Sequence, residues 1–304
     1  MALDLDNWTA EYLSEELADR DDLGMMTLRQ AIDLYTREKL TAILEKTGCE
    51  RWGEVPFAEG WQSMDPQQEL GFYIGSMRMV IDEMDTVLLL MPLEESTSGS
   101  LFAQAAERIS AKAIAYGEAF MEKETGGREE SDRILQLIRE EGVTSVIASP
   151  THMVALARAA ARQAETGADD IYLRSILLTG GFAPNKTVMM LEETFQAMVF
   201  EFSDIPAAGL GIAASCGYGK GSHIREADLF IELINPVTEE AVRFESPKTP
   251  GFSNYGEIVL TTLNREDAPL VRFRTGYYSR WIFGVCPCGS QLKRLDKIIP
   301  GEEK

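Results

Sequence analysis

The sequence predicts an α/β fold, in which a mainly parallel sheet with flanking helices is followed by an antiparallel, β-rich subdomain. Three observations predict it. Short apolar runs alternate with helical patterns across residues 85–208. After residue 209 the apolar runs are rich in β-branched and aromatic residues, and no helical pattern separates them. With 304 residues, 45% of them hydrophobic, the chain is large enough to bury a substantial core.

The first region, residues 1–84, is expected to combine a helix with a loop. Apolar positions at helical spacing predict a helix over residues 27–47, with Thr27 as its N-cap and Gly48 as its end. Residues 53–68 mix Pro, Gly, Trp and acids without a period, and they predict a connecting loop.

The second region, residues 85–208, is the predicted α/β layer. Because parallel strands need crossover connections, its alternating pattern predicts βαβ units with helices on both faces of the sheet. The expected strands cover residues 87–91, 113–116, 145–148, 176–178 and 198–202, and the expected helices cover residues 100–111, 129–140, 151–164 and 185–197.

The third region, residues 209–304, is the predicted β-rich subdomain. Gly, Asn and Pro separate its strands, as expected of antiparallel connections. These strands are expected at residues 228–234, 257–262, 270–273 and 278–283.

Charge and hydropathy exclude several classes of protein. A formal net charge of −20 repels polyanions, so neither nucleic acid nor an anionic membrane is an expected partner. No apolar stretch approaches the roughly 20 residues of a membrane span. Residues 1–6 carry no basic segment before an apolar one, which predicts a cytoplasmic protein.

Three cysteines and a histidine form the clearest candidate site. Cys216 and His223 are close in sequence, and Cys286 and Cys288 belong to a Cys-Pro-Cys-Gly turn. Three thiolates and one imidazole are the ligands of a closed, tetrahedral structural zinc site. The alternatives are cysteines that are merely buried near a histidine, or a redox Cys-x-Cys pair; we favour zinc. Cys49 is left over and is expected to be packed.

Three further segments resemble one enzyme family. The segments Glu257–Leu263, Pro269–Gly276 and Cys286–Gly289, in this order and spacing, resemble the phenylacetate–coenzyme A ligase branch of the adenylate-forming (acyl-coenzyme A synthetase) superfamily. Residues 143–150, 178–184 and 223–229 resemble it too, so the likeness covers about residues 85–300. It implies the large N-terminal-domain core of an adenylate-forming enzyme, which activates a carboxylic acid with ATP and passes the acyl group to coenzyme A.

The chain departs from this family's pattern on the nucleotide side. No segment matches the Ser/Thr/Gly-rich phosphate loop; residues 92–100 are interpreted instead as a loop with a helix N-cap at Ser98 or Ser100. Ala207 stands where the family has its magnesium carboxylate, although Asp204 or Glu201 could substitute from a shifted register. Tyr277 replaces the Asp that accepts both ribose hydroxyls. The sequence ends where the family has its hinge, so the C-terminal lid with its lysine is expected to be absent.

The remaining candidate residues belong to a small-molecule pocket. In the family, the turn that matches Gly180, Gly181 and Phe182 flanks the adenine and the acyl group; otherwise it is a tight strand-to-helix turn. His152 begins a helix and lines an acyl pocket, caps the helix or lies on the surface. Arg274 binds an anion or pairs with Glu257.

The sequence therefore favours a degenerate, non-catalytic ligase relative that acts as a binding or assembly partner, of a full-length ligase relative or of a second copy. Structural zinc is its expected cofactor, ATP, AMP and magnesium are not, and a small carboxylic acid or acyl-coenzyme A is a candidate ligand. The alternative is an acyl- or aryl-coenzyme A ligase (AMP-forming) that a partner chain completes. A third hypothesis is a sensor of acids or acyl thioesters.

Overall fold

The computed structural model describes residues 4–18, 20, 25–49, 66–93, 98–117, 127–205, 211–244, 254–264 and 269–301. Its backbone forms two compact units, which are described separately: residues 69–204, and residues 1–68 together with 205–304. Among the described residues no helix is both long and apolar enough to cross a membrane.

The unit of residues 69–204 contains a five-stranded parallel sheet in the order β2-β1-β3-β4-β5. Short apolar runs that alternate with amphipathic segments fold as βαβ units, as the sequence predicts. The strands are β1 (Thr86–Leu90), β2 (Lys112–Ala115), β3 (Ser145–Ala148), β4 (Ser175–Leu178) and β5 (Met198–Asp204). The helices are α3 (Pro66–Met77), which enters this unit, α4 (Ser98–Ile109), α6 (Arg128–Glu141), α7 (Pro150–Glu165) and α8 (Asn185–Phe195).

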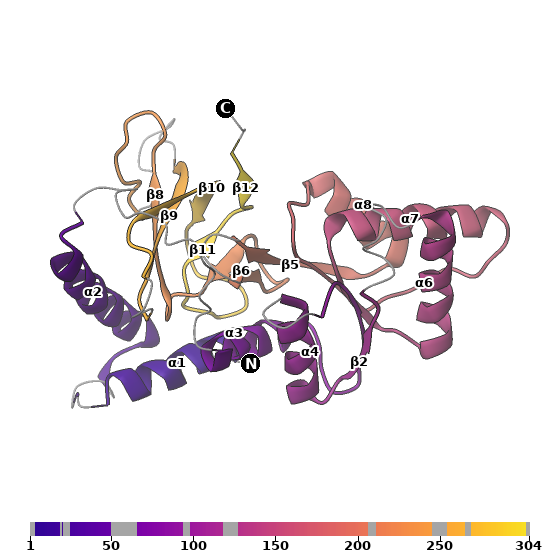
Figure 1. The fold of residues 1–304 in the computed structure, drawn as a ribbon, viewed down its shortest axis with the longest axis horizontal. Coiled ribbons are helices and arrows are strands. Elements are labelled where there is room, and N and C mark those ends of the chain that lie inside the picture. Colours follow the sequence, from indigo (N-terminus) through magenta and orange to yellow (C-terminus); the bar gives the residue numbers. More distant parts are fainter. Residues whose placement is uncertain are drawn as a thin grey trace. The chain divides into compact units, whose positions relative to one another are not determined.

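Helices cover both faces of this sheet (Figure 1). Alternate strand residues such as Leu88 and Val146 pack with α6, α7 and α8 in one apolar cluster. On the opposite face, Phe202 of β5 contacts the rings of Tyr73 in α3 and Phe102 in α4, with centroids 4.7 and 5.0 Å away. Burial on both faces explains why the central strands are uninterrupted apolar runs.

The other unit is built on antiparallel strands. Two sheets share β10: β6-β7-β11-β10, and β8-β9-β10 with β12 also paired to β10. The strands are β6 (Gly211–Ser215), β7 (Ser222–Ile224), β8 (Leu229–Ile234), β9 (Tyr255–Thr262), β10 (Phe273–Ile282), β11 (Arg294–Leu295) and β12 (Ile299–Pro300). Their inward residues form a second apolar cluster around Trp281.

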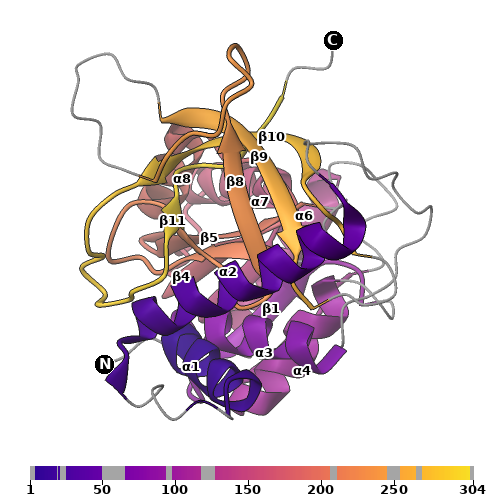
Figure 2. The ribbon, with the colours of Figure 1, turned by 90° about the vertical axis from the view of Figure 1, so that its left-hand side faces the viewer.

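Two N-terminal helices, α1 (Asp4–Glu16) and α2 (Leu28–Thr47), belong to the same unit. Helix α2 has the predicted ends: the Thr27 hydroxyl accepts from the backbone N–H of Gln30, and Gly48 follows in the left-handed conformation. Figures 1 and 2 show α2 alongside β8 and β9, and Tyr35 in α2 donates a hydrogen bond to Asn264, 2.9 Å away, after β9.

The structure corrects three predicted details. Residues 66–68, the end of the predicted loop of residues 53–68, already belong to α3, and residues 53–65 lie outside the described residues. Residues 270–272, predicted as part of a strand, lie outside β10, which begins at Phe273; Arg272 has a φ of +48°, which interrupts extended pairing. Neither of the predicted N-cap residues precedes α4, because Ser98 is its first residue and Ser100 lies inside it. Gly99 is needed there because a Cβ atom would come within 1.8 Å of the Pro92 carbonyl oxygen, so this Ser-Gly-Ser segment serves close packing.

Candidate functional site

The four predicted metal ligands converge in the β-rich unit. The Sγ atoms of Cys216, Cys286 and Cys288 and a ring nitrogen of His223 all lie within 4.8 Å of one another. Cys216 follows β6, and His223 lies in the middle of β7, between β6 and β11. Antiparallel pairing therefore brings together residues that are far apart in the sequence.

A tight turn presents the other two thiols. The backbone N–H of Gly289 donates to the Cys286 carbonyl, 2.9 Å away, and Gly289 has a φ of +90°, which only glycine adopts without strain. The Cys-Pro-Cys-Gly pattern thus folds back so that both sulfur atoms face the same point.

Two of the ligand pairs have a spacing close to that around a tetrahedral metal. Bonds of about 2.3 Å to sulfur at tetrahedral angles place two ligand atoms roughly 3.5–3.8 Å apart. The Sγ atoms of Cys216 and Cys286 are 3.5 Å apart, and Cys288 Sγ is 3.3 Å from His223 Nε2. His223, Cys216 and Cys286 are buried, and Cys288 is partly buried. Four protein ligands would close the metal's coordination shell, which is the form of a structural site.

Burial sets the protonation of the ligands. Burial, reinforced by Arg294, lowers the pKa of His223 to about 4, so the imidazole is neutral and able to bind a metal at neutral pH. Burial raises the pKa of the Cys216 and Cys288 thiols. At Cys286 burial acts in the same direction but is outweighed by hydrogen bonds, first from the backbone N–H of Cys288, so its pKa is lowered. A divalent cation would favour the thiolate at all three.

Arg294 links the two ligand segments and is a residue that the sequence analysis missed. It is 5% exposed, and its guanidinium donates to the carbonyls of Lys220 and Gly284, at 2.9 and 3.0 Å. These carbonyls precede His223 and Cys286, respectively. Three thiolates around a divalent metal carry a net charge of −1, which this buried cation would compensate. No sequence pattern marks Arg294.

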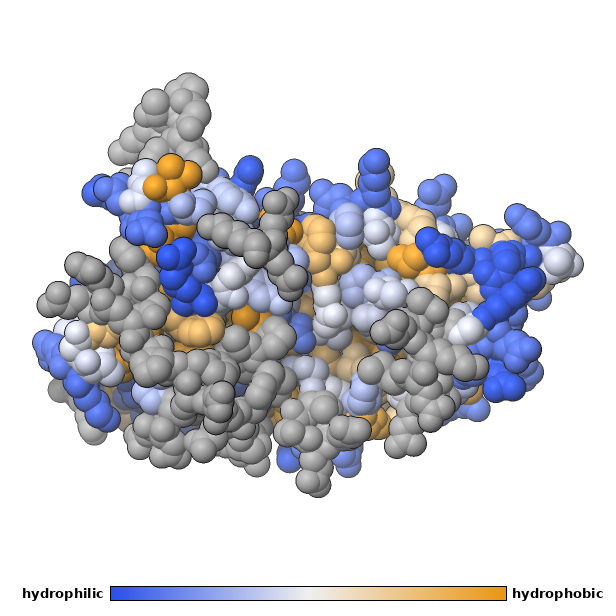
Figure 3. All heavy atoms as spheres, turned by 45° about the horizontal axis from the view of Figure 1, so that its top comes forward, coloured by the Kyte–Doolittle hydropathy of each residue, from blue (hydrophilic) through white to orange (hydrophobic). Residues whose placement is uncertain are grey.

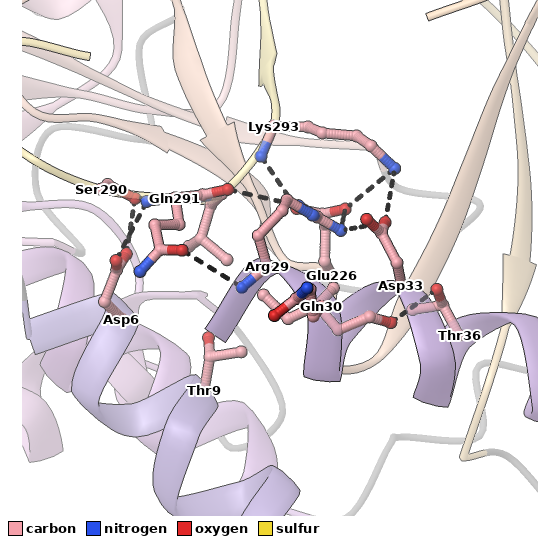
Figure 4. A network of polar contacts seen from close by, with 12 residues as sticks. Asp6, Thr9, Arg29, Gln30, Asp33, Thr36, Glu226, Ser290, Gln291 and Lys293 are labelled. Carbon is pink, nitrogen blue, oxygen red and sulfur yellow. Dashed lines mark hydrogen bonds and ion pairs between the residues drawn. The ribbon is translucent and has the colours of Figure 1, made fainter. Parts of the chain in front are cut away.

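Polar contacts join the same segments to the N-terminal helices (Figure 4). Asp6 in α1 accepts hydrogen bonds from the Ser290 hydroxyl, at 2.5 Å, and the Gln291 backbone N–H, at 3.1 Å, just after Cys288. Glu226, three residues after His223, accepts from Arg29 in α2, at 2.6 Å, and from the Lys293 backbone N–H, at 2.8 Å. Both halves of the candidate metal site are thus tied to α1 and α2.

A second polar group lies at the carboxyl ends of β4 and β5 in the other unit. Asp204, at the end of β5, accepts from the Thr179 hydroxyl at 3.2 Å and from the Gly180 backbone N–H at 3.4 Å. Gly180 has a φ of +69°, which the turn requires. Burial raises the pKa of Asp204 above its ordinary value, although these hydrogen bonds oppose the shift.

The predicted pocket residues do not all face the same way. Ser149, not His152, caps α7, because its hydroxyl accepts from the His152 backbone N–H at 3.2 Å. Burial lowers the pKa of His152, and a hydrogen bond to the backbone of Leu90 in β1 opposes it, so this side chain is directed toward the strands. Phe182, 42% exposed, instead lines a hollow between α6, α7 and α8.

Arg274 lies in the β-rich unit and pairs with Glu257, which is the second of the two alternatives given for it. Its Nε atom is 2.9 Å from Glu257 Oε2, and a second nitrogen contacts the same oxygen. The hydrogen bond to Glu257 raises the pKa of Arg274 further. The Gly276 backbone N–H donates to the other carboxylate oxygen at 3.2 Å. Glu201, the other proposed magnesium carboxylate, is in β5, and Ala207 lies outside the described residues.

Asp204 provides a test of how this edge of the sheet is stabilised. A raised pKa means that Asp204 stabilises the fold most when protonated: its contribution is full below about pH 3.8 and is lost as pH rises through the raised value. Asp204→Asn keeps an acceptor but never ionises. We expect it to raise the free energy of unfolding by about 0.5–2 kcal/mol at neutral pH, with a smaller gain near pH 5, in urea titrations.

The control for this variant is Asp170→Asn, which removes the same charge from an exposed residue. It is expected to leave the stability unchanged at both pH values. If Asp204→Asn were less stable than the unchanged protein at neutral pH, the turn at Gly180 would require the ionised carboxylate, and the expected direction would be wrong.

Comparisons with known proteins give consistent results for sequence and fold. No family model matches the chain. A phenylacetate-coenzyme A ligase of Pseudomonas putida is 29% identical over 182 residues, which are 57% of this chain and 37% of the ligase. One of Thermus thermophilus is 33% identical over 92 residues, which are 30% of this chain and 19% of the ligase. The chain thus matches much less than half the length of either relative.

Solved structures of 2-hydroxyisobutyryl-CoA ligase share the fold. The ligase in complex with 2-HIB-AMP and CoA in the thioesterification state has a TM-score of 0.63 and 18% identity, over 84% of this chain and 52% of that one. Its open conformation has a TM-score of 0.59 and 19% identity, over 76% and 51%. The chain therefore resembles phenylacetate–coenzyme A ligases in sequence, as its motifs predict, and has the α/β fold of the large domain of adenylate-forming acyl-coenzyme A ligases.

Proposed function

We propose that this chain is a non-catalytic relative of acyl-coenzyme A ligases, which keeps their scaffold, fastens its β-rich unit with a structural zinc ion and serves as a binding or assembly partner. The zinc would be held by Cys216, His223, Cys286 and Cys288. Its role would be to staple the segment after β6 to the turn after β10, because a shell of four protein ligands leaves no position for a substrate. A full-length ligase relative or a second copy of the chain is the proposed partner.

The environment of Tyr277 is the main observation that supports this proposal. Where the resemblance calls for an Asp that binds both ribose hydroxyls, the Tyr277 ring packs against the apolar cluster around Trp281. A phenol offers one hydroxyl where two acceptor oxygens are needed. In the same motif, the Glu257 carboxylate accepts hydrogen bonds from the Arg274 side chain and from the Gly276 backbone N–H. The polar groups of this motif are therefore bonded to each other, which disfavours nucleotide binding here.

The alternative is an acyl- or aryl-coenzyme A ligase that a partner chain completes. Asp204 favours it, because a carboxylate with a raised pKa at the carboxyl edge of a parallel sheet is typical of functional sites. In this alternative the chain itself must still hold adenosine and the acid. Binding of AMP to the chain alone therefore separates the two hypotheses.

Calorimetric titration with AMP and with magnesium and ATP tests the proposal, together with pyrophosphate exchange over a panel of carboxylic acids. We expect no AMP binding up to about 1 mM and no exchange above background. Tyr277→Asp restores the missing acceptor and is expected to improve AMP binding by about tenfold. Tyr277→Phe keeps the packing, loses the hydroxyl and is expected to match the unchanged protein.

Two results would count against the proposal. Carboxylate-dependent exchange by the unchanged chain would show catalysis. AMP binding that Tyr277→Phe weakens would show that the tyrosine hydroxyl serves the nucleotide, and would favour the alternative. Thermal unfolding of each variant checks that the added charge of Tyr277→Asp leaves the β-rich unit folded.

A further inference from the structure

A short segment, residues 290–293, lies between the Cys-Pro-Cys-Gly turn and β11, and it also contacts the N-terminal helices (Figure 4). The Ser290 hydroxyl and the Gln291 backbone N–H donate to Asp6 in α1, at 2.5 and 3.1 Å. The Gln291 side-chain oxygen accepts from the Arg29 backbone N–H in the first turn of α2, at 3.3 Å. The position of the ligand turn and the docking of both helices therefore depend on the same few residues.

The other ligand segment reaches α2 through Glu226, three residues after His223. The Glu226 carboxylate accepts from the Arg29 guanidinium at 2.6 and 2.9 Å, and from the Lys293 backbone N–H at 2.8 Å. Arg29 is the second residue of α2. The contacts of α1 and of the start of α2 thus converge on the two segments that carry the candidate metal ligands.

These contacts lie in a buried environment, so their loss is costly. Asp6, Ser290 and Glu226 are all buried. A buried carboxylate that loses its donors is not solvated in their place, so each hydrogen bond stabilises the fold only while both partners keep their positions. Because Asp6 belongs to α1, its carboxylate returns to water only if α1 moves away. A shift of residues 290–293 therefore favours detachment of this helix.

Glycine residues flank the ligands and give their segments little rigidity of their own. Gly217, Gly221, Gly284 and Gly289 all have positive φ, and each lies within two residues of a ligand. Glycine gains more conformational freedom on release than any other residue. The side-chain contacts between the ligands themselves involve thiols, which are weak donors and acceptors. A metal bound by all four ligands would therefore hold these segments more firmly than the ligands do by themselves.

Detachment of α1 would uncover an apolar surface, because Leu5 and Leu13 in α1 and Ile32 in α2 are buried. By contrast, on the face of the molecule in Figure 3 the hydrophobic side chains are scattered among hydrophilic ones. The later part of α2 is held separately, since Tyr35 donates to Asn264 after β9 at 2.9 Å. Movement is therefore expected at α1 and at the first turn of α2, and not in the rest of α2.

We propose that metal occupancy of the four-ligand cluster controls the docking of α1. The helix is docked when the cluster holds a metal, and α1 detaches together with the first turn of α2 when it does not. This inference rests on the zinc site of the proposed function and adds a conformational consequence to it: the metal content of the chain decides whether the apolar face of α1 is available at the surface.

Hydrogen–deuterium exchange of the full chain, measured by mass spectrometry with zinc bound and after removal of zinc by a chelator, tests this inference. We expect removal of zinc to speed exchange in α1 by at least about tenfold more than in β9, which stays paired within its sheet. Exchange in β3, in the other unit, is expected to stay the same. Binding of the dye anilinonaphthalene sulfonate to exposed apolar surface is expected to rise as α1 detaches.

The variant Asp6→Ala separates helix docking from metal binding. It removes the acceptor on α1 but no ligand, so it is expected to keep about one zinc ion per chain. With zinc bound, its α1 is expected to exchange at least about tenfold faster than α1 of the unchanged protein. The matched control is Glu11→Ala, which removes an exposed carboxylate from the same helix and is expected to change exchange less than about twofold. Protected amides in β9 establish that each variant is folded.

Two outcomes would overturn the inference and leave the zinc site of the proposed function intact. One is that zinc binds but its removal speeds exchange equally in α1 and β9, or in neither. The other is that α1 of zinc-bound Asp6→Ala is as protected as α1 of the unchanged protein. Absence of zinc binding, measured first by mass spectrometry of the metal, would contradict the proposed function as well.

Discussion

Cys286→Ser is expected to abolish zinc binding, whereas the unchanged protein carries about one zinc ion per chain. Cys286 is 2% exposed and its Sγ atom faces that of Cys216, so its loss opens the shell of four ligands. Binding of a structural metal adds to the free energy of folding. We expect Cys286→Ser, or removal of the metal by a chelator, to lower the free energy of unfolding by at least about 3 kcal/mol.

Mass spectrometry of the metal and urea unfolding measure these effects. Cys49→Ser is the matched control, because Cys49 is also buried but lies outside the cluster. It is expected to keep the zinc and to lose at most about 1–2 kcal/mol. If the unchanged protein contained no metal, and added zinc neither bound nor stabilised it, the four residues would be no more than buried thiols beside a histidine.

Asp228→Ala is expected to have the second large effect, because it would remove the carboxylate that pairs with the buried guanidinium of Arg225. Asp228 and Arg225 form an ion pair between side chains that are both 0% exposed. Asp228 also accepts from the Asn264 amide, 3.3 Å away. Removal of one partner of a buried ion pair typically costs about 3–5 kcal/mol, since the remaining charge is left in a medium of low polarity.

The comparison for this variant is Asp33→Ala. Asp33 contacts Arg29 at 2.7 Å, but its side chain is 46% exposed, so water replaces the lost carboxylate. We expect a loss below about 1 kcal/mol. Urea unfolding of both variants measures the difference. Equal effects would mean that the Arg225–Asp228 pair contributes no more than a surface contact.

The sequence was a good guide wherever structure follows from local periodicity. The predicted helix of residues 27–47 is α2, with the predicted N-cap Thr27 and the predicted end Gly48. The predicted strand of residues 145–148 is β3, with the same bounds. In these segments spacing, capping residues and apolar runs all favour one structure, so the local signal suffices.

Local patterns failed in the short strands of the β-rich unit. Strands β7 and β11 have three and two residues and were not predicted from the sequence. Such segments are too short to show a period, and they are extended only because neighbouring strands pair with them. His223 nevertheless lies near the three cysteines in the structure, and it was predicted from its chemistry and not from its secondary structure.

Residue type and spacing alone predicted the parallel layer, the four residues of the candidate metal site and the resemblance to ligases. They could do so because periodicity and ligand chemistry depend on short segments of the chain. Only the folded structure decided which distant groups meet: Arg294 joins the two ligand segments, and Asp6 and Glu226 accept hydrogen bonds from residues that follow Cys288. These contacts arise from strand pairing and helix packing between residues far apart in sequence, and such pairing leaves no local pattern to read.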